Sequence, residues 1–174
     1  MARNETNPEK IKYSYDLTKQ GKFFRKARAI VIKNGKLLAI RIDYNNGKHH
    51  YLLPGGGVDD NETIKDAMVR ETLEEYNAVV VPTKYLDKQY YNIPLEYNGE
   101  KFVSHRIDYY YICEFKNFSN NTGFGIGEEF KKDDRTYTKV ELSLEDVLSE
   151  KPQNLNSMCE RTYKKLVYYM KTLL

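Results

Sequence analysis

Residues 53–62 read LPGGGVDDNE and residues 70–75 read RETLEE, and the rest of the chain can be placed relative to these two stretches. Glycine lets the backbone bend sharply and lets other groups approach it closely, so the first stretch predicts a tight turn. Residues 63–76 contain neither Gly nor Pro, which predicts a helix that begins directly after the turn. The sequence therefore predicts a glycine turn that leads into one helix.

The predicted helix has recognisable ends and two apolar sides. Asp60 or Asn61 is expected to cap its start, and Asn77 tolerates the left-handed conformation that often ends helices. Two apolar stripes on opposite sides predict that the helix is covered on both. The stripes are Val69, Leu73 and Tyr76 on one side and Ile64, Ala67 and Met68 on the other.

Three carboxylates on this helix point to a bound cation. Glu71, Glu74 and Glu75 stand at spacings of i, i+3 and i+4, so they share one patch of the helix surface. Like charges at such spacings cost about 0.2–0.5 kcal/mol per pair even on an exposed helix. A hard divalent cation, which prefers oxygen ligands, would offset this repulsion.

Together the two stretches resemble the Nudix box of the Nudix (MutT-like) hydrolases. That pattern is Gly, five residues, Glu, seven residues, then Arg-Glu-apolar-any-Glu-Glu-any-Gly-apolar. Six matches at fixed offsets would arise by chance in roughly one chain in 10⁵ of this length. Thr72 replaces an apolar residue and Asn77 replaces the closing Gly, and we expect slightly weaker packing with intact chemistry. The matching positions are Gly56, Glu62, Arg70, Glu71, Glu74 and Glu75.

The resemblance implies a role for each box residue. Glu71, Glu74 and Glu75 would hold Mg²⁺, with Mn²⁺ as the alternative ion, and a backbone carbonyl near Gly56 would complete the metal shell. Arg70 would orient Glu71, and Glu62 would support the metal-bound water or the loop. The general base would be Glu71 or an acidic residue on a later loop. The loop candidates are Glu128 and Glu129, for which a solvated charge cluster is an equally open reading.

The resemblance also implies an activity, namely Mg²⁺-dependent hydrolysis of a nucleoside diphosphate linked to another group X. X would be a phosphate, a sugar or a second nucleotide, and nothing in the sequence selects among them. Two alternatives stay open. One is a non-catalytic Nudix-like module that senses a nucleotide, although such modules tend to lose the box carboxylates. The other, weaker one is a prenyl diphosphate isomerase, whose Cys and Glu constellation is not evident here.

The composition favours one globular domain that acts on small molecules. The chain has 174 residues and a net charge of +3, which argues against a partner as extended and anionic as a nucleic acid. Residues 1–10 are polar, and no apolar run approaches the ~20 residues of a membrane helix, so neither a signal peptide nor a membrane span is expected. Cys113 and Cys159 form no metal or redox pattern, which suggests reduced thiols and a cytoplasmic location.

The N-terminal segment is ambiguous in sequence. Ile11, Tyr13 and Tyr15 alternate with polar residues, which predicts a short edge strand, while a tail or a dimer arm is equally open. We therefore divide the chain into an N-terminal arm or edge strand at 1–20 and a single Nudix domain at 21–174. A homodimer formed through the arm is one option.

Strand signals dominate the remaining chain. Asn34-Gly35 and Asn98-Gly99 are strong hairpin signals between β-rich runs, and Pro82 is expected to stop a strand. Strands around a central helix predict a mixed β-sheet between helices, which resembles the Nudix α/β/α sandwich. The expected strands are residues 27–32, 36–41, 49–53, 78–81, 85–92, 102–115 and 138–142, with a loop over 117–136.

Two capping boxes predict helices near the end of the chain, one starting at Ser143 and one at Ser157. The second helix carries an apolar stripe that should dock on the sheet. Candidate substrate contacts lie elsewhere. Arg25 and Arg28 would hold a phosphate at the start of the first strand, although a solvated strand end is the simpler interpretation of these residues. Tyr90 would stack on a base, although rim packing is the simpler interpretation of Tyr90.

Overall fold

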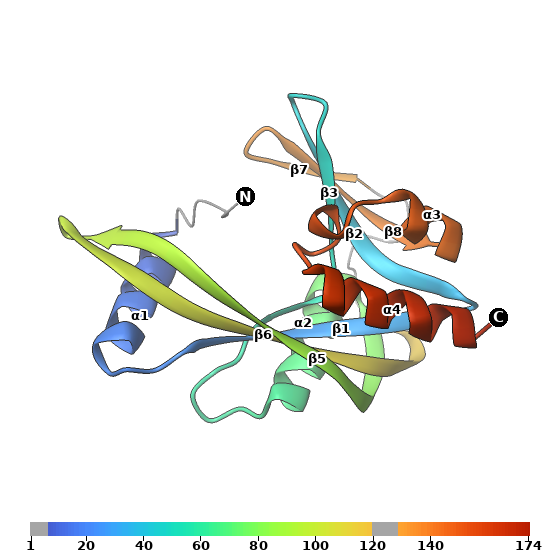
Figure 1. The fold of residues 1–174 in the computed structure, drawn as a ribbon, viewed down its shortest axis with the longest axis horizontal. Helices are drawn as coiled ribbons and strands as arrows, with labels where there is room; N and C mark the ends of the chain where they lie inside the picture. Colours follow the sequence, from blue (N-terminus) through green and yellow to red (C-terminus); the bar gives the residue numbers. More distant parts are fainter. Residues whose placement is uncertain (1–6, 120–128) are drawn as a thin grey trace.

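The computed structural model describes residues 7–119 and 129–174, which form one sheet with helices on its faces (Figure 1). The main path of the sheet is β5-β6-β1-β2-β8-β7, with β3 paired to β2 and β4 paired to β1. β1 and β6 run parallel and the other pairs are antiparallel, so the sheet is mixed. The strands are β1 (Phe24–Lys33), β2 (Lys36–Tyr44), β3 (His49–Leu52), β4 (Gly55–Gly57), β5 (Ala78–Tyr97), β6 (Glu100–Phe118), β7 (Glu129–Lys132) and β8 (Arg135–Leu142).

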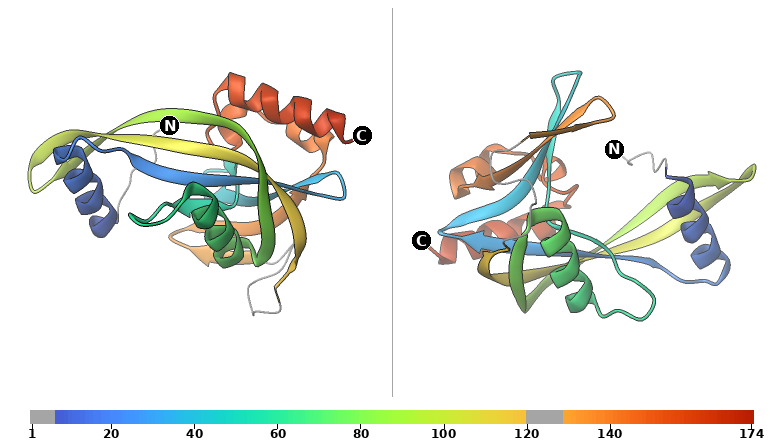
Figure 2. Two further views of the ribbon diagram at one scale, coloured as in Figure 1. Left: turned by 90° about the horizontal axis from the view of Figure 1, so that it is seen from below. Right: turned by 180° about the vertical axis from the view of Figure 1, so that it is seen from behind.

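Helices cover both faces of the sheet, as Figure 2 shows for α2 and α4. Successive strand residues point to opposite faces, so β1 contributes side chains to a hydrophobic core on each face of the sheet. Ala29 belongs to the core that contains Met68 of α2, and Ile30 belongs to the core that contains Leu166 of α4. The predicted α/β/α sandwich with a mixed sheet is thereby confirmed. The helices are α1 (Pro8–Lys19), α2 (Ile64–Tyr76), α3 (Leu144–Ser149), the 3₁₀ helix η1 (Pro152–Asn154) and α4 (Glu160–Thr172).

The N-terminal segment is a helix, so the predicted edge strand is wrong. Pro8 occupies the first turn of α1, and the Asn7 side chain caps it by accepting bonds from the amides of Glu9 and Lys10. These are strong helix-start signals that outweigh a short alternation of polar and apolar residues. In Figure 1, α1 lies beside the far end of the β5-β6 hairpin.

Tyr15 anchors α1 to that hairpin. Its ring centroid lies 4.9 Å from that of Tyr97 and 5.3 Å from that of Phe102, and its hydroxyl donates to Glu100 at 2.6 Å. Lys19 also pairs with Glu100. The helix is therefore docked on the sheet rather than extended from it.

β5 continues through Pro82, where the sequence predicted an end. The strand lies at the edge of the sheet path, where a residue without an N–H is tolerated on the unpaired side. Register shifts between Pro82 and Lys84 and between Tyr85 and Asp87 absorb the irregularity. Both Asn-Gly hairpins are confirmed, at Lys33↔Lys36 and at Tyr97↔Glu100.

Helix ends were predicted with mixed success. Asn77 ends α2 in the left-handed conformation (φ 58°), and Ser143 forms a capping box with Asp146, both as expected. Thr63 caps α2 in place of Asp60 or Asn61. Cys159 precedes α4 without a side-chain cap, so the second capping box is wrong.

α2 is covered on one side only, which corrects the expectation of two covered sides. Ala67, Met68, Thr72 and Tyr76 are buried against the sheet, while Leu73 is 36% exposed. Residues 120–128 of the predicted loop at 117–136 lie outside the described residues, but β7 and the start of β8 fall within the predicted loop and pair with each other. None of the helices in residues 7–119 and 129–174 has the length and apolar content to cross a bilayer.

Candidate active site

The glycine turn is held against the first strand of the sheet. β4 pairs with β1, with Gly55 opposite Arg28 and Gly56 opposite Ala27. Gly55 has φ +147°, and a Cβ there would lie 1.9 Å from the carbonyl oxygen of Ala27. A Cβ on Gly56 would lie 2.4–2.7 Å from the carboxylate atoms of Glu71. Both positions therefore require glycine, and Gly56 does so because a carboxylate of α2 packs directly on the turn.

Arg70 connects the carboxylates of the box to the turn. Its Nε and one Nη donate to the two carboxylate oxygens of Glu62 at 2.8 and 2.9 Å, a bidentate pair. The other Nη donates to Glu71 at 2.8 Å, and the Gly57 carbonyl accepts a further bond at 3.0 Å. The bonds from Arg70 lower the pKa of Glu62 below its usual value, and these carboxylates raise the pKa of Arg70. Arg70 thus fixes the position of Glu71 relative to the turn.

The other two box carboxylates differ in their surroundings. Glu75 remains in contact with solvent as a residue, but its carboxylate reaches back to the turn and accepts a bond from the Gly55 amide at 3.1 Å. Desolvation by the surrounding protein raises the pKa of Glu75, and the nearby Arg28 charge opposes that shift. Glu74 lies at the solvent side, with its side chain 59% exposed and 3.5 Å from Arg70.

The carboxylates of α2 are suitable ligands for a divalent cation, but in this structure they form hydrogen bonds with protein groups. Three carboxylates on adjoining turns of α2 are the hard oxygen donors that Mg²⁺ prefers. Among the described residues, however, no three His, Cys, Asp or Glu side chains converge on one point. Glu71 accepts a bond from Arg70 and Glu75 accepts one from the Gly55 amide, so each of these two carboxylates already has a protein donor.

The predicted substrate residues lie in two different places. Arg28 is 4% exposed, and its Nε lies 3.3 Å from a carboxylate oxygen of Asp108, which also pairs with Arg106 at 2.7 Å. Arg28 therefore forms no basic entry on the surface. Arg25 lines a cavity beside α1, and Tyr90, 57% exposed, has its ring 6.4 Å from that of Phe23 at the same cavity.

Of the loop acids, one is described by the structure. Glu129 is exposed on β7, which two strands separate from β1 along the sheet path, and is not brought to the box. Glu128 lies outside the described residues. The buried Asp108 was missed by sequence reasoning, although a charge inside the apolar alternation of residues 102–115 is a signal that could have found it.

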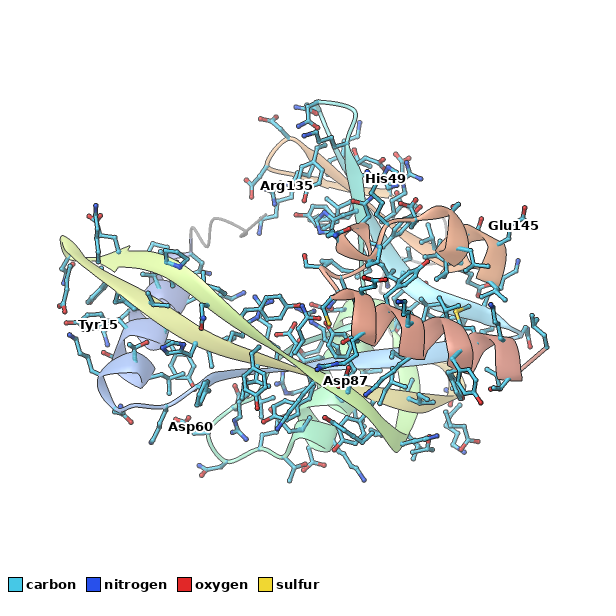
Figure 3. The ribbon with its side chains drawn as sticks, in the orientation of Figure 1. Tyr15, His49, Asp60, Asp87, Arg135 and Glu145 are labelled. Atoms are coloured by element: carbon cyan, nitrogen blue, oxygen red, sulfur yellow. The ribbon has the colours of Figure 1, made fainter. Side chains whose placement is uncertain are left out.

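A contact between distant segments was also missed. The Tyr13 hydroxyl of α1 donates to the Asp60 carboxylate, 3.1 Å away, on the loop between β4 and α2. Figure 3 labels Asp60 on that loop. No local sequence signal could have found this bond, because it depends on where α1 docks.

Comparison with known sequences gives a family and two relatives. The family model described as NUDIX domain matches residues 23–155. Two curated proteins named RNA pyrophosphohydrolase, from Wolbachia sp. subsp. Drosophila simulans (strain wRi) and Wolbachia pipientis wMel, are each 43% identical over 63 residues. Those residues cover 30% of this chain and 39% of each relative, so the match spans well under half of the relatives' length.

Comparison with solved structures supports the fold. A NUDIX hydrolase from Nitrosomonas europaea gives a TM-score of 0.56 at 15% identity, covering 86% of this chain and 90% of that one. The E. coli ORF135 protein gives a TM-score of 0.51 at 18% identity, covering 87% and 91%. The matched sequence region contains the glycine turn, the whole of α2 and all of β1 to β8. On this evidence, the chain belongs to the Nudix family.

Proposed function

We propose that this chain hydrolyses the diphosphate linkage of a nucleoside diphosphate joined to another group X, with Mg²⁺ as cofactor and Mn²⁺ as the alternative. The observation that carries this proposal is the Glu71 carboxylate packed on Gly56 and held there by Arg70. Membership of a family of pyrophosphate-bond hydrolases and the printed name of the two relatives support the same reaction class.

The proposed roles rest on the pattern of the box and on the contacts that Arg70 makes. Glu71, Glu74 and Glu75 would hold the ion, which when bound would neutralise phosphate charge and help to activate water. Arg70 keeps Glu71 oriented, and Glu62 keeps Arg70 oriented through the bidentate pair. Water would attack one phosphorus, its proton would pass to a carboxylate, and the bridging oxygen would leave with the other phosphate.

The first test is formation of a nucleoside monophosphate and a second phosphorylated product from a panel of nucleoside triphosphates, sugar nucleotides and dinucleoside polyphosphates, with Mg²⁺ and with a chelator. We expect metal-dependent cleavage of one class. Glu75→Gln should reduce kcat by about 10²-fold or more, because it removes a charged oxygen donor from the site. Glu160→Gln, at an exposed carboxylate of α4, is the matched control and should cleave at the wild-type rate.

Two results would contradict the proposal. Wild-type turnover by Glu75→Gln at saturating Mg²⁺ would remove this residue from the site. Tight nucleotide binding without turnover of any compound would favour the nucleotide-sensing module instead.

A further inference from the structure

A cavity of about 670 Å³ lies between α1 and the loop that joins β4 to α2. This volume is within the range of about 300–1,000 Å³ that is typical of small-molecule sites. Val58 lines the cavity, and the carbonyl of the preceding residue, Gly57, accepts a bond from Arg70, so the cavity is adjacent to the proposed reaction site. The lining side chains used below are Tyr13, Lys22, Phe23, Arg25, Asp60 and Tyr109.

One wall of the cavity is specific to this chain rather than to the family match. The family model begins at residue 23, whereas α1 spans Pro8–Lys19. Two attachments hold α1 in place, the Tyr13–Asp60 hydrogen bond at the loop and the Tyr15–Glu100 bond at the hairpin. The cavity therefore exists because this N-terminal helix closes a side of the Nudix core.

The cavity contains two cations without a protein partner. Within residues 7–119 and 129–174, neither Lys22 nor Arg25 makes a side-chain hydrogen bond or ion pair. Arg25 is partly buried, and taking a charge out of water is unfavourable unless an opposite charge or hydrogen-bond acceptors replace the lost hydration. Asp60, the acid at the same cavity, accepts a bond from Tyr13 and forms no ion pair with either cation in the described part of the chain. These two side chains are therefore available to an anion.

Aromatic rings line the same cavity as Lys22 and Arg25. Tyr13, Phe23 and Tyr109 line the cavity, and the exposed ring of Tyr90 lies 6.4 Å from Phe23 at its edge. Aromatic side chains provide broad flat surfaces for stacking on a base, and a guanidinium recognises a phosphate through its planar set of donors. A base joined to a phosphate satisfies both requirements in one molecule.

We propose that this cavity binds the nucleoside monophosphate unit of the substrate, with its phosphate on Arg25 and Lys22 and its base among the aromatic rings. That the bound mononucleotide is part of a substrate rests on the proposed function. That the cavity binds a mononucleotide does not. The rest of the substrate would extend past Val58 and Gly57 toward Glu71.

The test is calorimetric binding of AMP and UMP to the full chain in the presence of a chelator, with inorganic phosphate and adenosine as partial probes. We expect at least one mononucleotide to bind more tightly than either partial probe. Arg25→Ala should weaken that binding by about tenfold or more, because it removes charge-assisted bonds, and Arg25→Lys should retain part of it. Lys164→Ala removes an exposed cation on α4 and should bind as the wild type does.

An NMR measurement on the unmodified protein covers the case in which a variant fails to fold. Added mononucleotide should shift the amide signals of residues 13–25 and 58–61 and leave those of α4 unchanged. Equal binding by wild type and Arg25→Ala, shifts confined to other regions, or no binding of either mononucleotide would overturn the inference. Loss of binding in Arg25→Ala without hydrolysis of any compound would uphold the cavity and contradict the proposed function instead.

Discussion

At the scale of single residues, Thr72 shows how a local departure from the box pattern affects packing. Its side chain is fully buried, and its hydroxyl finds no partner among the described residues. An unsatisfied buried hydroxyl costs about 1–3 kcal/mol. Thr72→Val keeps the shape and removes the polar atom, so we expect the melting temperature to rise by roughly 2–4 °C per kcal/mol gained.

Thr162 provides the matched control for this stability measurement. It is equally buried, but its hydroxyl donates to Asp87 at 2.9 Å. Thr162→Val should therefore lower the melting temperature. A fall in melting temperature for Thr72→Val would show that its hydroxyl is satisfied after all.

At Gly56 the backbone packs directly against the carboxylate of Glu71. Because a Cβ would lie 2.4 Å from a carboxylate atom of Glu71, Gly56→Ala should displace that carboxylate and reduce kcat on the order of a hundredfold. The comparison is Gly57→Ala, whose Cβ would meet only Phe24 at 3.6 Å. Equal turnover by the two variants would mean that the position of Glu71 does not matter for catalysis.

At the scale of elements, the attachment of α1 depends on few contacts. Tyr13→Phe removes the bond to Asp60 and leaves the ring contact with Phe24, whose centroid is 5.8 Å away. We expect the backbone amides of α1 to exchange roughly five- to tenfold faster, because one such bond contributes about 1 kcal/mol to closing the helix onto the core. Lys12→Ala, which removes an exposed pair with Asp16 on α1, should change this exchange far less.

The helix α1 also shows which features could be predicted from the sequence and which could not. Asn7 and Pro8 carried enough local information to predict a helix, and the alternation of Ile11, Tyr13 and Tyr15 was given too much weight. The docking of α1 could not be predicted, since it depends on Glu100, which is more than eighty positions away from Tyr15. Hairpins and the box helix were predictable because their signals are local, as with Asn34-Gly35 and Asn77.

The candidate site follows the same rule. The residue types of the box could be predicted from their spacing, and in the structure Arg70 donates a hydrogen bond to Glu71. The burial of Arg28 against Asp108 could not be predicted from the sequence. These residues are eighty positions apart and come into contact through the parallel pairing of β1 with β6.

At the scale of the whole molecule, a buried carboxylate couples α4 to the sheet. Asp87 of β5, labelled in Figure 3, accepts bonds from Thr162 and Arg161 of α4 and is 8% exposed. Partial burial alone would raise the pKa of Asp87, but the bonds from Thr162 and Arg161 outweigh it and hold the pKa below its usual value.

A depressed carboxyl pKa makes a stability contribution that is complete above the unfolded-state value and is lost as the pH falls through the folded value. We therefore expect the free energy of unfolding in urea to fall between about pH 5 and pH 2. Asp87→Asn should be less stable at pH 7 and should show a smaller decrease in acid. Glu114→Gln, at an exposed acid on β6, is the control; the same acid-induced decrease in Asp87→Asn and the control would contradict this role.

The long edge strand has a further consequence, which concerns solubility. β5 is twenty residues long, and within residues 7–119 and 129–174 no strand pairs with its outer side. An open edge of that length invites the backbone of another molecule to add to the sheet and start aggregation. Pro82 and Pro94 each remove an N–H from this strand, and its register shifts bend it. The irregularities that made β5 read as two shorter strands in the sequence are features that disfavour edge-to-edge association with other copies.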